Sequence, residues 1–290
     1  MKKEPAQQRG FLKRALARAG RAGSYRLHHL AQWLPGVPRL PLKVNFFPHF
    51  PHDKYILWKV CHSLGLPLAN QPFQSGACNI YWLDDTLRPA LPQAELALNI
   101  INGRCLDVGK LTLEPAHLAA FGYQAQVDPT RHTGPAVCKS NLNAKHDGCI
   151  VQCPLQRAEP DHVYQRLIDN STGDGEVMDI RVPIVGRQIP FVYLKYRPVA
   201  SRFANVNTRA RFEQTGALLT PTEQQQILDL AARLGLELGE VDVVRDRPTG
   251  KIYVIDISNS PYGPPNHIDP VSYHQALHAY CSALLDLLRC

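Results

Sequence analysis

Between residues 42 and 85, the order of hydrophobic and polar residues has the spacing of two short strands and one helix. Residues 42–47 and 78–85 have the apolar and β-branched or aromatic content of strands, and residues 52–66 repeat apolar positions at helical spacing up to Gly65. A strand, a helix and a strand in this order predict a small open α/β unit that closes near residue 100.

The pattern changes from residue 101 onward. A helix is predicted to begin at Lys110 and end at residues 121–123, and a short strand ends at Lys139 before a polar loop and a second strand from Cys149. Residues 161–170 are consistent with either a short helix or a strand. Residues 177–198 then alternate as two strands joined at Gly186.

The last part of the chain is predicted to contain two helices around a hairpin. Within residues 219–238 a helix is predicted. Thr220 or Thr222, together with Glu223, would cap its start, and Gly235 would end it. Strands follow at 241–247 and from Lys251. Residues 269–290 have the pattern of an amphipathic helix, for which we expect a packing role.

The hairpin raises a question of charge. If Pro248, Thr249 and Gly250 form a three-residue loop with glycine in the left-handed conformation, Asp242 falls directly opposite Asp256. Two carboxylates in this position repel each other, so a cation between them is expected, and Mg²⁺ is the candidate for such oxygen ligands. The alternative is a loop of another length, with the two acids on different faces.

Basic residues elsewhere are suited to anions. The segment 103–111 lacks the spacing and the Ser or Thr of a phosphate-binding P-loop, which leaves Lys110 at the entry of a helix. Lys139 precedes a loop whose composition suits a polyphosphate, although a plain polar hairpin loop has a similar composition. The loop residues with this chemistry are Ser140, Asn141, Asn143, His146 and Gly148. On the paired strands, Arg181, Lys195 and Arg197 could face an anion together or line a solvated sheet face.

The net charge of +7 over 290 residues is concentrated at the N-terminus. Residues 1–30 carry eight basic side chains and one acid, so the remainder of the chain is neutral and a nucleic-acid partner is not expected. Apolar positions at helical spacing in this leader suggest docking on an anionic membrane surface or on a protein, and a solvated leader is the alternative. With no apolar run long enough to span a bilayer and no signal peptide, we expect a cytoplasmic protein.

The ordered set of these parts resembles the ATP-grasp superfamily over about residues 100–267. The parts are a lysine before a helix, a lysine on a strand before a polar loop, the strand "DIRV", a long helix followed by "GEVDVV", and the strand "YVIDIS" before a Pro/Gly loop. The resemblance implies an α/β and α+β protein in which two α+β subdomains, residues 101–165 and 166–290, clasp ATP. A small open α/β domain, residues 41–100, precedes this ATP-grasp domain 101–290, and residues 1–40 form a basic amphipathic leader and linker.

The resemblance also assigns roles to residues. Lys110 and Lys139 would bind the phosphates of ATP beneath the loop 140–148, and Arg181 would steady the transferred phosphate. The segment bordering the adenine would include Tyr164, Gln165, Leu167 and Ile168. Asp242 and Asp256 would bind Mg²⁺, and the family's asparagine is replaced, so that either Ser258 or a bulged Asn259 would complete the site.

The function implied is that of an ATP- and Mg²⁺-dependent ligase. It would activate the carboxylate of a small molecule or peptide as an acyl phosphate for attack by an amine, with Arg181, Lys139 and Lys195 as catalytic residues. Two alternatives stay open, a kinase acting on a hydroxyl and a non-catalytic nucleotide-binding regulatory module. Tyr262, Asn266 and His267 are candidates for the acceptor site.

Overall fold

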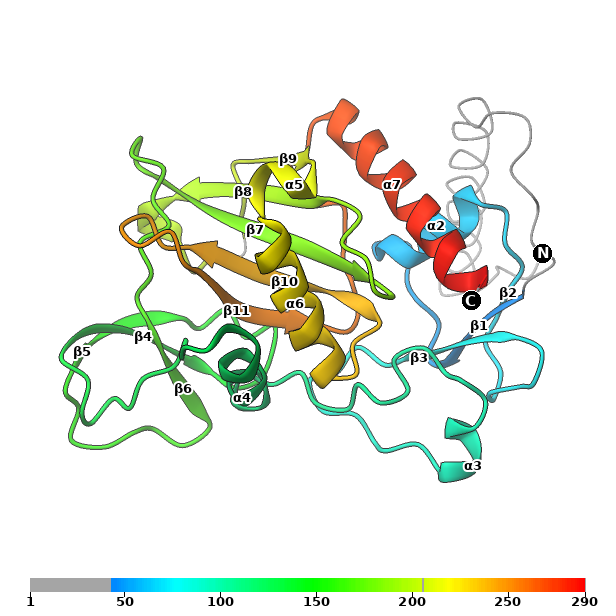
Figure 1. Cartoon of the computed structure of the whole chain (residues 1–290), viewed down its shortest axis with the longest axis horizontal. Helices are drawn as coiled ribbons and strands as arrows, with labels where there is room; N and C mark the ends of the chain where they lie inside the picture. Colours follow the sequence, from blue (N-terminus) through cyan, green and yellow to red (C-terminus); the bar gives the residue numbers. More distant parts are fainter. Residues whose placement is uncertain (1–42, 205, 290) are drawn as a thin grey trace, which may run out of the picture.

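The structure, a computed structural model, describes residues 43–204 and 206–289, which form three sheets and their covering helices (Figure 1). The predicted basic leader and linker, residues 1–40, lie outside the described residues. The domain boundaries near residues 100 and 165 stay predictions.

The first sheet contains the predicted strand, helix and strand. Its parallel strands lie in the order β2-β1-β3, with β1 at Val44–Pro48, β2 at Leu68–Ala69 and β3 at Cys78–Trp82. The helix α2 spans Ile56–Ser63, and a short helix α3 spans Gln93–Leu96. The pattern of apolar positions therefore predicted β1, α2 and β3 correctly, but it did not predict the short elements β2 and α3, which are too short to show a period.

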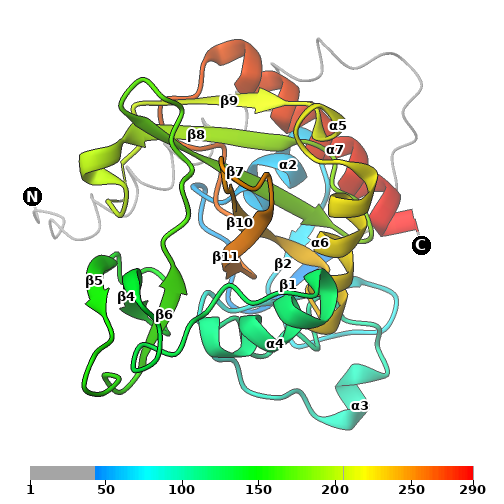
Figure 2. The same ribbon diagram turned by 60° about the vertical axis from the view of Figure 1, so that its left-hand side comes forward.

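The second sheet is small and antiparallel, in the order β5-β4-β6. Its strands are β4 at Gly134–Ser140, β5 at Cys149–Cys153 and β6 at His162–Arg166, and the helix α4 at Lys110–Phe121 precedes them. Residues 161–170, for which the sequence was consistent with either a helix or a strand, thus contain the strand β6. In Figures 1 and 2 this sheet and α4 lie beside β11, the edge strand of the large sheet.

The third sheet has five strands in the order β11-β10-β7-β8-β9. The strands are β7 at Glu176–Val185, β8 at Val192–Pro198, β9 at Arg209–Glu213, β10 at Leu238–Arg245 and β11 at Ile252–Ser258. A 3₁₀ turn η1 at Val199–Ser201 and a short helix α5 at Thr215–Leu218 join them. The helix α6 at Pro221–Arg233 begins with a capping box formed by Thr220 and Glu223. Of the two threonines predicted, Thr220 is therefore the N-cap residue.

Strand alternation gives the large sheet two unlike faces. Ile180, Val182, Leu194, Val241 and Val243 belong to a core shared with α4 and α6. Because successive side chains point to opposite faces, the residues between them project from the other face, and these are largely charged. The charged residues on that face are Asp179, Arg181, Lys195, Arg197, Glu240 and Asp242.

The C-terminal helix α7, Pro270–Arg289, joins the first sheet to the large one. Its buried residues Leu277, Tyr280 and Leu284 share a core with Val44 of β1 and with Tyr193 of β8, as well as with α2. The packing role expected from its amphipathic pattern is confirmed.

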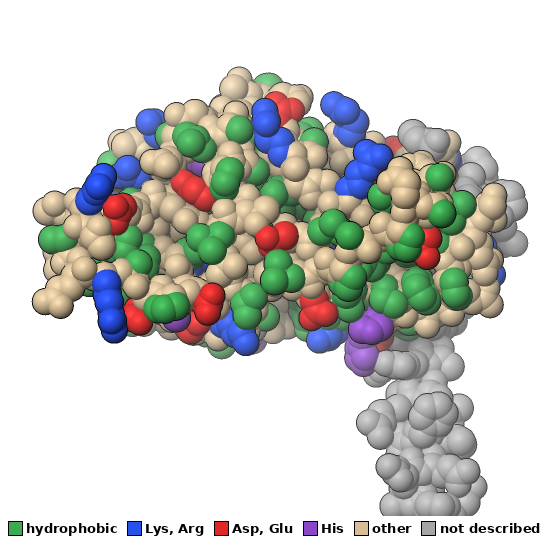
Figure 3. Space-filling view, turned by 90° about the horizontal axis from the view of Figure 1, so that it is seen from below, with side chains coloured by type: hydrophobic (Ala, Val, Ile, Leu, Met, Phe, Trp, Pro, Cys, Tyr) green, Lys and Arg blue, Asp and Glu red, His purple; other side chains and the backbone are tan. Residues whose placement is uncertain are grey.

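None of the described helices is long and apolar enough to cross a membrane. On the face shown in Figure 3, basic and acidic side chains are interspersed over the described residues.

Candidate functional site

The hairpin β10–β11 pairs Asp242 directly with Asp256, as predicted, but by a different route. The predicted three-residue loop is wrong, because the Asp246 amide donates to the Lys251 carbonyl and four residues, 247–250, lie between these two. Gly250 does adopt the left-handed conformation at φ 70°. A register shift between Asp242 and Val243 then restores the opposition of the two acids.

Asp242 is bound by two cations from neighbouring strands. Arg181 donates from Nε to Oδ1 and from Nη2 to Oδ2, each at 3.0 Å, and Lys195 Nζ lies 3.0 Å from Oδ1. Burial alone would raise the pKa of Asp242, but the two cations outweigh it and hold this pKa well below its usual range. Asp242 is therefore an ionised carboxylate with side-chain cations on both oxygens.

Glu240, two residues earlier on the same face of β10, extends this cluster. Its Oε2 lies 3.4 Å from Arg181 Nη1 and accepts a hydrogen bond from the Tyr262 amide. Its Oε1 is buried and has no hydrogen-bond partner among the residues that the structure describes. Burial raises the pKa of Glu240 to about 7, although Arg181 opposes the shift. Sequence reasoning missed this residue, although its spacing from Asp242 on an alternating strand was the available signal.

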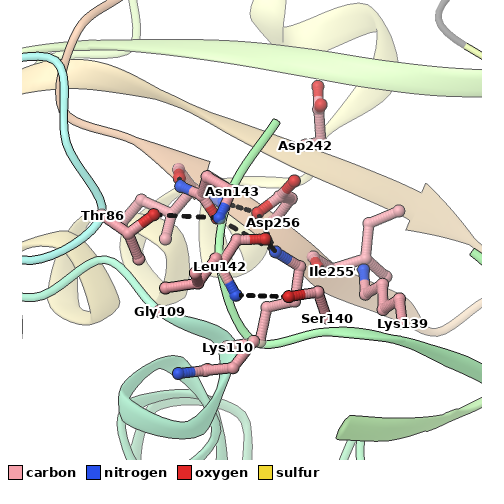
Figure 4. Close-up of polar contacts among 12 residues, drawn as sticks. Thr86, Gly109, Lys110, Lys139, Ser140, Leu142, Asn143, Asp242, Ile255 and Asp256 are labelled. Carbon is pink, nitrogen blue, oxygen red and sulfur yellow. Dashed lines mark hydrogen bonds and ion pairs between the residues drawn. The ribbon is translucent and has the colours of Figure 1, made fainter. Parts of the chain in front are cut away.

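Asp256, on the other strand of the hairpin, meets a lysine from α4. Lys110 Nζ lies 3.3 Å from Asp256 Oδ1 and donates to Asn143 Oδ1 at 3.0 Å and to the Leu142 carbonyl (Figure 4). Asn143 in turn donates from Nδ2 to the Ile257 carbonyl at 2.6 Å, and its amide donates to Thr86 Oγ1. Through Asn143, the loop 140–148 is thus bound both to Lys110 and to β11.

Lys139 reaches the same strand from the small sheet. Its Nζ donates to the Ile255 carbonyl at 2.8 Å (Figure 4). Burial lowers the pKa of Lys139 to about 8, Asp256 opposes this, and the charge of Lys110 adds to it. Two lysines from separate elements therefore converge on one strand and repel each other, which is a disposition suited to an anion between them.

The other predicted loop residues are placed differently from one another. The Ser140 amide donates to Asp147 Oδ1, and His146 is exposed in the left-handed conformation. Gly148 packs against Phe203 so closely that an added Cβ would lie 3.0 Å from its ring. These contacts bind the loop to itself and to the segment after β8, so the roles of Ser140, His146 and Gly148 at phosphate stay predictions.

The predicted adenine segment runs from β6 into the connection to the large sheet. Tyr164 and Gln165 are buried, and Gln165 Nε2 lies 3.5 Å from the same Ile255 carbonyl that Lys139 binds. Leu167 is half-buried, and the Ile168 carbonyl accepts a hydrogen bond from Arg202 at 2.9 Å. The segment thus lies next to the lysines, and its role at adenine stays a prediction.

The residues expected to hold Mg²⁺ do not form a ready ligand set. Asp242 is bound by Arg181 and Lys195, and Asp256 is paired with Lys110. Asn259 is buried and donates to the Asp85 carbonyl, while Ser258 Oγ forms hydrogen bonds with the backbone of Ser260 in its own turn. Within residues 43–204 and 206–289, no group of three or more His, Cys, Asp or Glu side chains could hold a metal ion.

Two buried residues missed from the sequence explain the position of Asn259. Arg88 donates to the Asn259 carbonyl and to Ser260 Oγ, and Asn102 donates from Nδ2 to the Leu238 carbonyl at 2.6 Å. Both hold the end of β11 against the first sheet. Neither stands in a recognisable motif, because their contacts with β10 and the end of β11 join residues more than 130 positions apart.

The small antiparallel sheet with its lysine, the large sheet with its charged face, and the connecting segment between them constitute an ATP-grasp fold. Solved structures confirm this. The protein is similar to the ATP-grasp ligase PsnB complexed with a phosphomimetic variant of its minimal precursor, Mg and ADP, at 13% identity and a TM-score of 0.52, over 87% of this chain and 99% of that one. It is also similar to PsnB complexed with precursor peptide PsnA2 and AMPPNP, at 12% identity and a TM-score of 0.50, over 88% of this chain and 100% of that one.

A further alignment, to PsnB complexed with minimal precursor at 14% identity and a TM-score of 0.44, covers 65% of this chain and 64% of that one. No protein-family model matches the sequence, and no curated protein matches it either. At these identities the likeness shows the fold alone. The two PsnB structures with TM-scores of 0.52 and 0.50 confirm the fold that the ordered motifs predicted.

Proposed function

We propose that the protein is an ATP-dependent, ADP-forming ligase that joins a carboxylate to an amine. The observation that carries this proposal is the convergence of Lys110 and Lys139 on β11, from α4 and from the small sheet. Two mutually repelling lysines next to the predicted adenine segment are suited to binding the phosphates of a nucleotide.

ATP supplies the phosphoryl group when it is bound. In the proposed reaction, the substrate carboxylate accepts this group and becomes an acyl phosphate, and an amine then displaces phosphate. Lys110 and Lys139 neutralise charge that develops on the leaving phosphates, because each places an ammonium group at the same strand. Arg181, which Asp242 holds by two hydrogen bonds, has 22% of its side chain exposed and is oriented for the transferred group.

The acceptor site is proposed near the loop after β11. Tyr262 is 39% exposed there, and Asn266 and His267 are exposed as well. Complexes of PsnB with precursor peptides support a peptide as one class of substrate. A small-molecule carboxylate is the other class.

A non-catalytic nucleotide-binding module is the second candidate. The observation in its favour is that both oxygens of Asp242 are bound to Arg181 and Lys195. Such a module would bind nucleotide and would not turn it over.

The test is ADP formation from ATP with a panel of amino acids and peptides, with hydroxylamine as a trapping amine. The ligase predicts that ADP and a hydroxamate appear together for at least one carboxylate, and that Lys139→Met abolishes both. ADP formed at the same rate without any amine would instead identify a kinase. Nucleotide binding with no turnover over the whole panel would favour the non-catalytic module.

A further inference from the structure

The charged groups at the proposed nucleotide site are unequal in number. Lys110, Lys139, Arg181 and Lys195 supply four cations, whereas the carboxylates among them are Asp242, Asp256 and Glu240. The side chain of Lys195 is 6% exposed and that of Glu240 is 4% exposed, so water screens this cluster poorly. Among these groups the cations outnumber the carboxylates by one, and Asp147 of the polar loop also acts on the charge of Lys139.

The two carboxylates expected to bind a metal ion are already engaged, Asp242 through both oxygens and Asp256 through Oδ1. Lys195 Nζ and Arg181 Nε share Oδ1 of Asp242, and Arg181 Nη2 occupies Oδ2. Asp256 Oδ1 accepts the Ile257 amide at 3.1 Å as well as facing Lys110. A divalent cation would have to displace ammonium and guanidinium groups and would add two positive charges to this cluster.

We propose that the site binds the phosphates of a nucleotide without a divalent cation held by the protein, and that Lys195 occupies on Asp242 the position a metal ion would take. This inference rests on the proposed nucleotide site and concerns how its charge is balanced. The incoming phosphates neutralise the excess of lysine and arginine charge directly.

Two geometric features support this assignment of Lys195. It lies on β8, two strands away from β10, and reaches Asp242 across Arg181, so it adds a second positive charge where one already binds the carboxylate. The Lys195 side chain is also 6% exposed, so its ammonium group depends on Asp242 rather than on water for its charge balance. The Asn259 side chain is engaged as well: its Nδ2 donates to the Asp85 carbonyl, and its Oδ1, the atom that a metal ion would bind, accepts a hydrogen bond from Ser260 Oγ.

The experiment is calorimetric titration of the full chain with ADP, once in excess EDTA and once in excess Mg²⁺. We expect the two dissociation constants to agree within about threefold. Binding that is more than about tenfold weaker in EDTA would overturn the inference and leave the proposed nucleotide site intact. The absence of ADP binding in both buffers would overturn the proposed function together with the inference, so the two failures are distinguishable.

The variant Lys195→Met tests the assignment itself. It keeps the length of the side chain and removes its charge, and we expect ADP affinity in EDTA to fall about tenfold, with Mg²⁺ restoring most of the loss. Arg233→Met, at an exposed position on α6, is the matched control and leaves both affinities unchanged. Equal ADP affinity of Lys195→Met and the wild type in EDTA would show that Lys195 does not take the place of a metal, and thermal unfolding of each variant verifies its fold.

Discussion

Asp242 and Asp256 face each other on one hairpin, yet they belong to two different electrostatic regions. Asp242 lies in a buried cluster on β7, β8 and β10, where Arg181 and Lys195 bind both of its oxygens. Asp256 lies at the sheet edge, 36% exposed, with Lys110 at 3.3 Å. The first region is a network of paired charges within one sheet, whereas the second brings lysines together from separate elements.

Two residues that are directly paired in a β-hairpin can therefore have different electrostatic surroundings and different roles. A carboxylate on a central strand is surrounded by side chains of its neighbours, so its charge is balanced inside the sheet. A carboxylate on an edge strand is open to whatever packs alongside, here α4 and the small sheet. We therefore expect the stability of the protein to depend more on Asp242 than on Asp256.

The largest expected effect contrasts the two acids directly. Asp242→Ala removes the carboxylate that binds both Arg181 and Lys195 and leaves Glu240 as the counter-charge near them, and we expect a loss of about 3–5 kcal/mol in the free energy of unfolding. The matched change Asp256→Ala removes a carboxylate that is 36% exposed, and Lys110 keeps its hydrogen bonds to Asn143 and to the Leu142 carbonyl, so the loss should be smaller than for Asp242→Ala. Urea denaturation measures both, and equal losses would remove the distinction between the regions.

The variant Glu240→Gln tests whether the ionisation of Glu240 destabilises the buried cluster. Because the folded-state pKa of Glu240 is raised to about 7 from its ordinary value of 4.5, the folded protein binds more protons than the unfolded one between these values, and stability falls as pH rises through this window. Glutamine cannot ionise, so the variant should be more stable than the wild type by about 2 kcal/mol at pH 8, and less so at pH 5. Denaturation at the two pH values tests this, and a difference independent of pH would contradict it.

Lys139→Met probes the second region. We expect ADP affinity to fall about tenfold, because one charge-assisted contact to phosphate is lost. The free energy of unfolding should not fall, since a lysine whose pKa is already lowered by burial is removed. Calorimetry and urea denaturation separate the two effects, and a loss of stability without a loss of affinity would assign Lys139 a structural role.

The smallest effect is the pH dependence of binding. Lys139 loses its proton as pH rises through its pKa of about 8, so ADP affinity of the wild type should fall about threefold between pH 7 and pH 9. In Lys139→Met this dependence should be reduced. A pH profile identical in the two proteins would show that another group controls it.

The outline of the fold could be predicted because its signals are local. The alternation through residues 177–198 gave β7 and β8 on either side of Gly186, and Thr220 with Glu223 marked the start of α6. The opposition of Asp242 and Asp256 was predicted correctly, although the loop was one residue longer than expected and the register shift on β11 compensated for it. A shift of this kind has no reliable sequence signal.

The charges that surround each acid could not be predicted in the same way. The sequence placed Arg181 and Lys195 on one face of adjacent strands, but it did not show that both bind Asp242, since this depends on β7 lying between β8 and β10. Glu240 was overlooked although it shares that face. Asn259 was left open as a ligand, and the structure turns its side chain to the Asp85 carbonyl.

By itself, the sequence determined most of the longer strands and helices, and that two acids oppose each other, because these depend on neighbours within a few residues or on one hairpin. The short elements β2, β9, α3 and α5 were not predicted. Only the tertiary structure decided that Lys139, Lys110 and Asp256 meet, and that Arg88 and Asn102 hold the end of β11 against the first sheet. Such contacts join residues more than a hundred positions apart, and their partners depend on how whole sheets pack rather than on any local pattern of residues.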